Sequence, residues 1–160
     1  RASLFGWIVF NVLVGNNDAH LKNLSFKVSH EGIQLAPFYD LLSVAVYDTA
    51  ALGKHNWPTQ TRLAWPLLGV SYFSDIDREL LLRAGAVLGL ATGTAERILE
   101  NLRSRILTEA EALYAEINDE VAGIVQARPA LSAMLAGELR CLRAIVHTII
   151  KEMSRRLGKH

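Results

Sequence analysis

The sequence has little of what would place it in several large protein classes. It holds one cysteine, Cys141, so no disulfide can form within the chain, which fits a reducing compartment. Its net charge of +1 excludes a general electrostatic attraction to nucleic acid or to a membrane surface. No apolar run reaches the roughly 18–20 residues that a membrane span needs. We therefore expect a cytoplasmic protein that makes no membrane contact.

Apolar residues, in contrast, are abundant. They make up 51% of the 160 residues, which is enough for a sizeable core and argues against disorder. The length fits one domain, and we expect residues 1–160 to form it. The chain begins at Arg1 without an initiator Met and enters core-like sequence at once. We interpret it as a fragment whose upstream part is absent.

The first half of the chain changes from a helical to an extended pattern. Residues 1–15 are apolar on every face and predict a buried helix that Gly15 ends. Apolar and polar residues alternate over 24–28 and again over 33–35, which predicts a half-buried antiparallel hairpin. Residues 44–60 predict an irregular surface segment. A second short hairpin is expected over 61–65 and 69–73.

From residue 74 onward the pattern is helical. Ser74-Asp75-Ile76-Asp77 resembles a capping box and predicts a helix to about Leu88, where Gly89 stops it. A long helix should follow, capped by Thr92 or Thr94 and ended by Arg128-Pro129, with a possible interruption at Asn118-Asp119. A last helix should begin near Ala130. The fold class expected is therefore mainly α, or α+β with one or two small hairpins, with residues 74–160 as a helical bundle.

One polar stretch stands directly after the first apolar run: Gly15-Asn16-Asn17-Asp18-Ala19-His20-Leu21-Lys22-Asn23. Polar groups beside a core are costly unless they are paired or bind a ligand or metal. Asp18 and Asn23 are five residues apart, which is the interval between the base and the metal-binding Asn of the kinase catalytic loop. This interval predicts a short loop that directs Asp18 into a cleft and brings Asn23 back one turn later. Asp40 follows Asn23 by 17 residues, after the predicted hairpin, where kinases place a second metal ligand. We expect the hairpin to bring Asp40 near the same end as Asp18.

This spacing suggests a role for each residue. Asp18 would orient an acceptor hydroxyl and accept its proton, and Lys22 would neutralise a transferring phosphoryl group. His20 would orient Asp18 or bond the backbone. Asn23 and Asp40 would supply the oxygen ligands that Mg²⁺ prefers. A metal-hydrolase site made of Asp18, His20 and Asp40 is an alternative, but it leaves Lys22 and Asn23 without a role.

The motifs make a resemblance specific. Asn17-Asp18-Ala19-His20-Leu21-Lys22-Asn23 and the later Pro37-Phe38-Tyr39-Asp40-Leu41-Leu42-Ser43 resemble the C-terminal kinase domain of HipA-like serine/threonine kinases. These kinases are toxins of bacterial toxin–antitoxin modules. The resemblance implies the C-terminal lobe of a protein-kinase-like fold, in which residues 1–73 carry the catalytic loop, the metal-binding hairpin and the irregular loop.

The resemblance also implies ligands and partners. It implies ATP as substrate and Mg²⁺ as cofactor, with Asp18 as base and with Asn23 and Asp40 as the metal and cofactor ligands. A protein substrate is implied, an aminoacyl-tRNA synthetase being the best-known kind. A helix-turn-helix antitoxin is the implied partner, through which DNA is contacted indirectly.

The chain departs from the family in one respect. No Gly-rich phosphate loop is found, because Gly85, Gly89 and Gly93 lie within helical sequence and follow no strand. We expect the nucleotide-binding lobe to be missing and the isolated chain to be inactive. Two other functions remain open: a non-catalytic helical module that binds an antitoxin-like regulator, and a small-molecule phosphotransferase of kinase-like fold.

Overall fold

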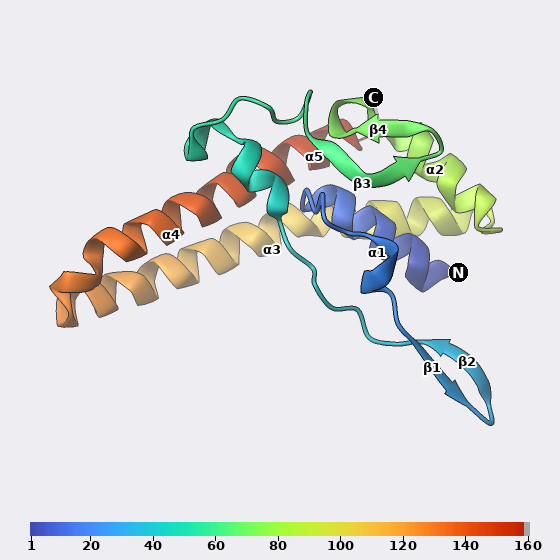
Figure 1. The fold of residues 1–160 in the computed structure, drawn as a ribbon, viewed down its shortest axis with the longest axis horizontal. Helices are drawn as coiled ribbons and strands as arrows, with labels where there is room; N and C mark the ends of the chain where they lie inside the picture. The colour runs from blue at the N-terminus through green and yellow to red at the C-terminus, as the bar shows by residue number, and fades with distance from the viewer. Residues whose placement is uncertain (159–160) are drawn as a thin grey trace.

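The computed structural model describes residues 1–158, so Lys159 and His160 at the predicted end of the last helix lie outside the described residues. The described part is mainly helical and carries two separate two-stranded antiparallel sheets, as the sequence predicts. Figure 1 shows α1 beside α3, with α4 extending away from it. The elements are α1 (Ala2–Leu13), β1 (Phe26–Ser29), β2 (Gly32–Leu35), β3 (Arg62–Leu67), β4 (Val70–Tyr72), α2 (Arg78–Val87), α3 (Thr92–Ala127), α4 (Ser132–Ala144) and α5 (Lys151–Arg156).

Helix α1 is the centre of the core. It packs against α2, α3 and α5, and Phe5, Val9 and Leu13 are completely buried along it. Burying each such side chain contributes about 1.5–3 kcal/mol to the stability of the fold. A helix that is apolar on every side is therefore most stable at the centre of the core. The helix ends at Leu13, and Gly15 takes the left-handed conformation with φ +65° that glycine adopts without steric cost.

The starts of α2 and α3 differ in their capping. Asp77 caps α2, because its Oδ1 accepts a 2.7 Å hydrogen bond from the Leu80 amide. The expected cap of α3 at Thr92 or Thr94 is wrong: Ala91 is the N-cap residue, and no side chain bonds the end of the helix. Thr92 is instead the first helical residue.

Helix α3 runs through Asn118-Asp119 without the interruption that the sequence suggested. Both residues are exposed, and Asn or Asp costs well under about 1 kcal/mol in a helix. That penalty is small beside the packing of α3 on α4. Figure 1 shows these two helices side by side, extending well beyond the other elements.

Helices α4 and α5 are joined by one π-helical segment, Ile145–Ile150. The side chains before and within this segment, Ala144 and Ile149, pack with Ala45 and Val46 in a small second core. The side chains of α5 and its C-cap residue, Met153 and Leu157, belong to the main core with Phe5. The predicted last helix is therefore one continuous element that serves two cores.

The β1–β2 hairpin forms where the sequence predicts it, but it is not half-buried. Val28 pairs with Ile33, and their side chains are 77% and 73% exposed. Direct partners share one face of a ladder, so an apolar face does form. Figure 1 shows the hairpin projecting away from the body of the molecule. Alternation identifies an apolar face correctly, but it does not tell whether another element covers that face.

Residues 44–60 are more ordered than the predicted irregular surface segment. They contain two short 3₁₀ helices, Val44–Asp48 and Ala50–Leu52. The Trp57 ring packs on Phe73 at 5.1 Å between centroids, and Trp57 Nε1 donates to Glu152 Oε2 at 3.1 Å. The segment is therefore fastened to the core and to α5.

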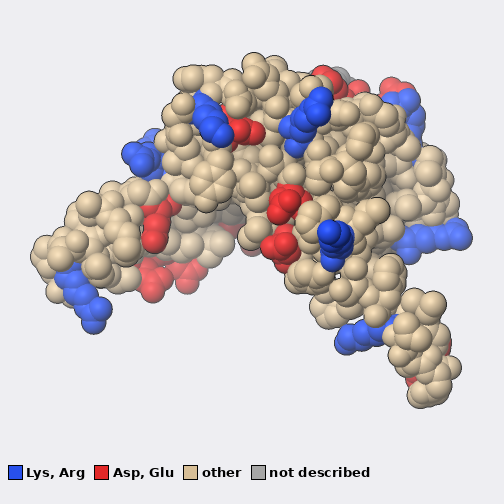
Figure 2. Space-filling model, viewed as in Figure 1, with Lys and Arg blue, Asp and Glu red and all other residues tan. Residues whose placement is uncertain are grey.

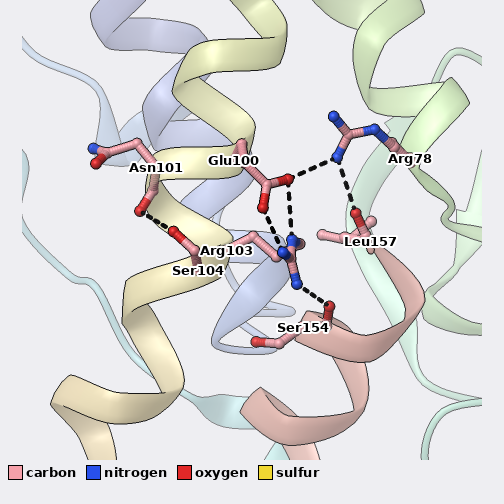
Figure 3. Close-up of polar contacts among 7 residues, drawn as sticks. All are labelled: Arg78, Glu100, Asn101, Arg103, Ser104, Ser154 and Leu157. Carbon is pink, nitrogen blue, oxygen red and sulfur yellow. Dashed lines mark hydrogen bonds and ion pairs between the residues drawn. The ribbon is translucent and has the colours of Figure 1, made fainter. Parts of the chain in front are cut away.

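A charged network joins three helices near the end of the chain (Figure 3). Arg78 Nη1 of α2 donates to Glu100 Oε2 of α3 at 3.2 Å and to the Leu157 carbonyl at 3.3 Å. Arg103 forms a bidentate pair with Glu100 and reaches the Ser154 carbonyl of α5 at 3.5 Å. Hydrogen bonds from Arg103 and Arg78 lower the pKa of Glu100 against the opposing effect of burial, and the Glu100 bond raises the pKa of Arg103.

Candidate active site

The polar loop leaves α1 through a very tight turn. A Cβ on Gly15 would lie 2.7 Å from Ile149 Cγ2 and 3.1 Å from Ala45 Cβ, so no larger residue fits there. The Ala45 amide also donates to the Gly15 carbonyl at 3.0 Å. The turn places Asn16 inside the protein and lets Asp18 emerge, with Asn16 3% exposed and the Asp18 side chain 60% exposed.

Asn23 returns to Asp18 as the five-residue interval suggests. A single 3₁₀ turn, Leu21–Asn23, brings its side chain back so that Nδ2 donates to the Asp18 carbonyl at 3.2 Å. Asn23 itself is 5% exposed. Because the nitrogen of its amide makes this bond, the amide oxygen is the atom left for a metal ion.

Asp40 arrives at the same end of the hairpin as Asp18, as the sequence predicts. The Asp40 carbonyl accepts a 3.0 Å bond from Asn16 Nδ2, and the Asp18 amide donates to Asn16 Oδ1 at 3.1 Å. The neighbouring Tyr39 hydroxyl donates to the Lys22 carbonyl at 2.7 Å. Two bridges therefore hold the loop that carries Asp18 against the loop that carries Asp40.

His20 and Lys22 make weaker contacts than the three residues above. His20 Nε2 lies 4.0 Å from Asp18 Oδ1, which is beyond hydrogen-bond distance. His20 Nδ1 and Asn17 Oδ1 are both buried, and neither has a hydrogen-bond partner among the described protein atoms. Such atoms need water or a ligand, since an unpaired buried polar group is costly. The Lys22 side chain is exposed, and only its backbone is fixed by Tyr39.

Asn16 lies within the polar stretch that the sequence indicates as a site, but the sequence suggests no role for it. The spacing in the sequence indicates Asp18, Asn23 and Asp40 because kinase side chains that touch the substrate or the metal stand at these intervals. Asn16 contributes instead through a side chain that bonds the backbone groups of Asp18 and Asp40, and no spacing rule addresses such contacts. The available signal was its position, since an amide directly after an apolar helix must find partners inside the protein.

Oxygen donors at this end of the hairpin fit a hard cation. Asp18 and Asp40 bring carboxylates and Asn23 an amide oxygen, which are the ligand types that Mg²⁺ prefers. Over residues 1–158, no group of three or more His, Cys, Asp or Glu side chains is arranged to hold a metal ion. That finding does not support the Asp18, His20 and Asp40 hydrolase alternative.

A small cavity lies behind the loop. Its volume is about 30 Å³, which suits a water molecule and is far below the hundreds of Å³ of a nucleotide pocket. Trp65 of β3 lines it and donates from Nε1 to the Ala19 carbonyl at 3.0 Å. The cavity is lined by Trp7, Ile8, Asn11, Val12, Asn16, Ala19, Leu63, Ala64, Trp65 and Leu67.

The surface charge is mixed. Figure 2 shows basic and acidic side chains interspersed over this face of the molecule, as expected for a net charge of +1. Within the described residues, no helix combines the length and the apolar character required to cross a bilayer.

Comparison with known proteins places these features in a family. The family model described as "HipA-like C-terminal domain" matches residues 1–110. The "Serine/threonine-protein kinase toxin HipA" of Shewanella oneidensis is 44% identical over 48 residues, 30% of this chain and 11% of that protein. A "putative kinase" of Haemophilus influenzae is 43% identical over 71 residues, 42% of this chain and 18% of that protein.

A solved structure shares the fold. A chain of the complex of HipA, HipB and operator DNA from the Shewanella oneidensis toxin–antitoxin system matches with a TM-score of 0.55 and 22% sequence identity. The match covers 96% of this chain and 33% of the solved one. At that identity the likeness shows the fold alone. The chain spans about a third of the length of this solved relative.

Proposed function

This chain belongs to the family of HipA-like C-terminal domains, and from that premise we propose that it is the catalytic lobe of an ATP- and Mg²⁺-dependent serine/threonine protein kinase, the toxin of a toxin–antitoxin system. The observation that carries the proposal is that the chain segments bearing Asp18, Asn23 and Asp40 are held together at one end of the β1–β2 hairpin. The Asn16 side chain bonds the Asp18 amide and the Asp40 carbonyl, and Asn23 Nδ2 bonds the Asp18 carbonyl. Relatives named as kinases support the same class.

The proposed chemistry is transfer of the γ-phosphoryl group of ATP to a Ser or Thr hydroxyl. The acceptor oxygen forms a bond to phosphorus, the bond from phosphorus to the bridging oxygen of ADP breaks, and that oxygen keeps the electron pair. The exposed Asp18 carboxylate orients the hydroxyl and takes its proton. Lys22, whose ammonium is free to move, neutralises charge on the transferring group.

Asn23 and Asp40 would hold Mg²⁺, which when bound neutralises the charge of the nucleotide phosphates. The protein's own contribution is to present the oxygens. Asn23 does so because its nitrogen is engaged by the Asp18 carbonyl. His20 completes the proposed set by orienting the Asp18 carboxylate, for which its Nε2 would have to close the 4.0 Å gap to Asp18 Oδ1 when substrate binds.

The partners proposed for the whole protein follow from the relatives. The solved relative is in a complex with HipB and operator DNA, which supports a HipB-like antitoxin as partner and DNA contact through it. The family resemblance suggests that this antitoxin is a helix-turn-helix protein. The proposed substrate is a protein, and the family resemblance suggests an aminoacyl-tRNA synthetase. We propose further that residues 1–160 act as one domain and that the main ATP-binding residues lie outside it.

The test is phosphoryl transfer by the full-length protein. We expect labelled phosphate from ATP to appear on protein Ser or Thr, and Asp18→Ala to lower the rate by about 10²–10⁴-fold, as for loss of a general base. Asp119→Ala, which removes an exposed carboxylate from α3, is the matched control and should keep the wild-type rate. The chain of 160 residues alone should show no efficient turnover.

Three results would contradict the proposal. If Asp18→Ala transfers phosphate as fast as the wild type, Asp18 is not the base. If the label appears on a metabolite or an antibiotic, the protein is a small-molecule phosphotransferase. If the full-length protein transfers nothing but binds an antitoxin-like regulator, it is a non-catalytic interaction module.

A further inference from the structure

We propose that Asn16 is the positioning residue of this site, a role that rests on the proposed function and adds a residue to it. Its side chain is buried, with 3% of the residue exposed. It makes hydrogen bonds to the two peptide segments that carry the site carboxylates: Oδ1 accepts from the Asp18 amide at 3.1 Å, and Nδ2 donates to the Asp40 carbonyl at 3.0 Å. One amide therefore sets the separation of Asp18 and Asp40.

The orientation of this amide is fixed from behind. Asn16 Nδ2 also donates to Asn11 Oδ1 at 2.7 Å, and Asn11 Nδ2 donates to the Trp7 carbonyl of α1 at 2.8 Å. Both hydrogens of the Asn16 nitrogen are thus used, and its oxygen is used as well. If the amide were flipped, its NH₂ group would face the N–H donor of Asp18. Its oxygen would then face the carbonyl acceptor of Asp40. The chain of bonds connects the site rigidly to the core helix.

The backbone conformation of Asp40 is a second reason why the hydrogen bond from Asn16 matters. Its backbone is left-handed, with φ +58°, a region that residues with a Cβ enter at a steric cost. A conformation of this kind persists only where the surroundings hold it. The hydrogen bond from Asn16 to the Asp40 carbonyl holds the backbone in this conformation. It thereby determines the position of the Asp40 carboxylate.

A residue with a purely structural role would stabilise the fold without affecting the spacing of the two carboxylates. Thr61 provides that comparison. It is completely buried, and its hydroxyl donates to Asp48 Oδ2 at 3.1 Å, away from the site. Thr61→Val should therefore lower the thermal stability while leaving metal binding unchanged.

The experiment uses the full-length protein and two variants of Asn16. Asn16→Asp keeps an acceptor for the Asp18 amide but cannot donate to the Asp40 carbonyl, and Asn16→Leu removes both bonds at similar size. We expect both variants to weaken Mn²⁺ binding, measured by electron paramagnetic resonance of the free ion, by about tenfold or more. Since small displacements of catalytic groups cost about 10²-fold in rate, kcat should fall far more than KM changes.

Hydrogen exchange supplies a readout that does not depend on activity. The Asp18 amide should lose its protection in Asn16→Leu and keep it in Asn16→Asp and Thr61→Val. This pattern also shows that each variant is folded, because amides in the core of α1 should remain protected in all three.

The outcomes separate this inference from the proposed function. Wild-type Mn²⁺ affinity and kcat in both Asn16 variants would overturn the positioning role, as would an equal loss of affinity in Thr61→Val. A wild-type protein that binds no Mn²⁺ would overturn it too. If Mn²⁺ binding depends on Asn16 but no phosphate is transferred to protein, the positioning role stands and the kinase function fails.

Discussion

Arg78 and Glu100 connect α2 to α3 through a 3.2 Å ion pair, and the same carboxylate holds Arg103 beside it (Figure 3). Through the Leu157 and Ser154 carbonyls, the two guanidinium groups also reach the α5 region. The Glu100 carboxylate thus links α2 to α3 directly, and it links both to the α5 region through the two arginines that it holds. Its protonation should therefore be measurable as a loss of stability.

The first prediction concerns pH. Because bonds from Arg103 and Arg78 lower the pKa of Glu100 in the folded state, this carboxylate stabilises the fold above its ordinary pKa of 4.5. That contribution is lost as the pH falls below 4.5 through the lower folded-state value. Glu100→Gln should cost about 1 kcal/mol at pH 7 and should lessen the decline in stability as the pH falls below 4.5. Urea unfolding at several pH values measures both effects.

A matched carboxylate on the same helix serves as the control for this prediction. Glu109 pairs with Arg105 at 3.1 Å, but both side chains are 66% exposed. Exposed pairs contribute little, so Glu109→Gln should change the free energy of unfolding by under about 0.5 kcal/mol. An unaltered pH profile in Glu100→Gln would contradict the role assigned to the network.

The second prediction concerns Gly15. Gly15→Ala combines a positive φ with an added Cβ only 2.7 Å from Ile149, so it should destabilise the fold by roughly 2 kcal/mol or more. Gly123→Ala is the opposite case, because open space surrounds its Cβ position on α3. That change should stabilise the protein by about 0.5–1 kcal/mol. Equal effects in thermal unfolding would show that the turn after α1 is not as tight as described.

The third prediction separates a real helix cap from an expected one. Asp77→Ala removes the 2.7 Å bond to the Leu80 amide and should cost about 1 kcal/mol. Thr92→Ala removes no capping bond, since Ala91 is the N-cap of α3, and should be nearly neutral. Denaturant unfolding of the two variants under the same conditions measures the difference. A larger loss in Thr92→Ala would restore the capping role that the sequence suggested.

The fourth prediction concerns the projecting hairpin. Val28→Thr and Ile33→Thr keep β-branched side chains in the strands, and both positions are over 70% exposed. Each should cost under about 0.5 kcal/mol in this chain. Leu99→Ala, at a fully buried position of α3, should cost about 2–5 kcal/mol. Losses above about 1 kcal/mol at the hairpin would mean that its apolar face is covered in solution.

Much of the fold could be predicted from local patterns. Apolar periods and stop residues placed the core helix, both hairpins and the helical second half, because these signals act within a few residues. The spacing from Asp18 to Asn23 likewise predicted a turn, which the bond from Asn23 Nδ2 to the Asp18 carbonyl confirms. The catalytic and metal-binding roles of these residues remain predictions.

What the sequence could not show depends on contacts between distant segments. The hydrogen bond from Trp57 to Glu152 joins residues 95 positions apart, and no local sequence pattern predicts it. The exposure of Val28 depends on what lies over a strand rather than on the strand itself. No role could be predicted for Asn16 because its partners are the backbone groups of Asp18 and Asp40, which every residue possesses.

The π-helical segment Ile145–Ile150 changes which side of the last helix is inward. In an uninterrupted α-helix the residue four positions after Ala144, Thr148, would follow it on the same side. Instead Ile149 is buried and Thr148 is exposed, so the segment adds one residue to the repeat. One extra residue rotates everything that follows by about 100°. A single continuous helix can thereby pack against the 44–60 segment at its middle and against α1 at its end. The extra residue, and not the apolar composition alone, determines which side chains reach each core.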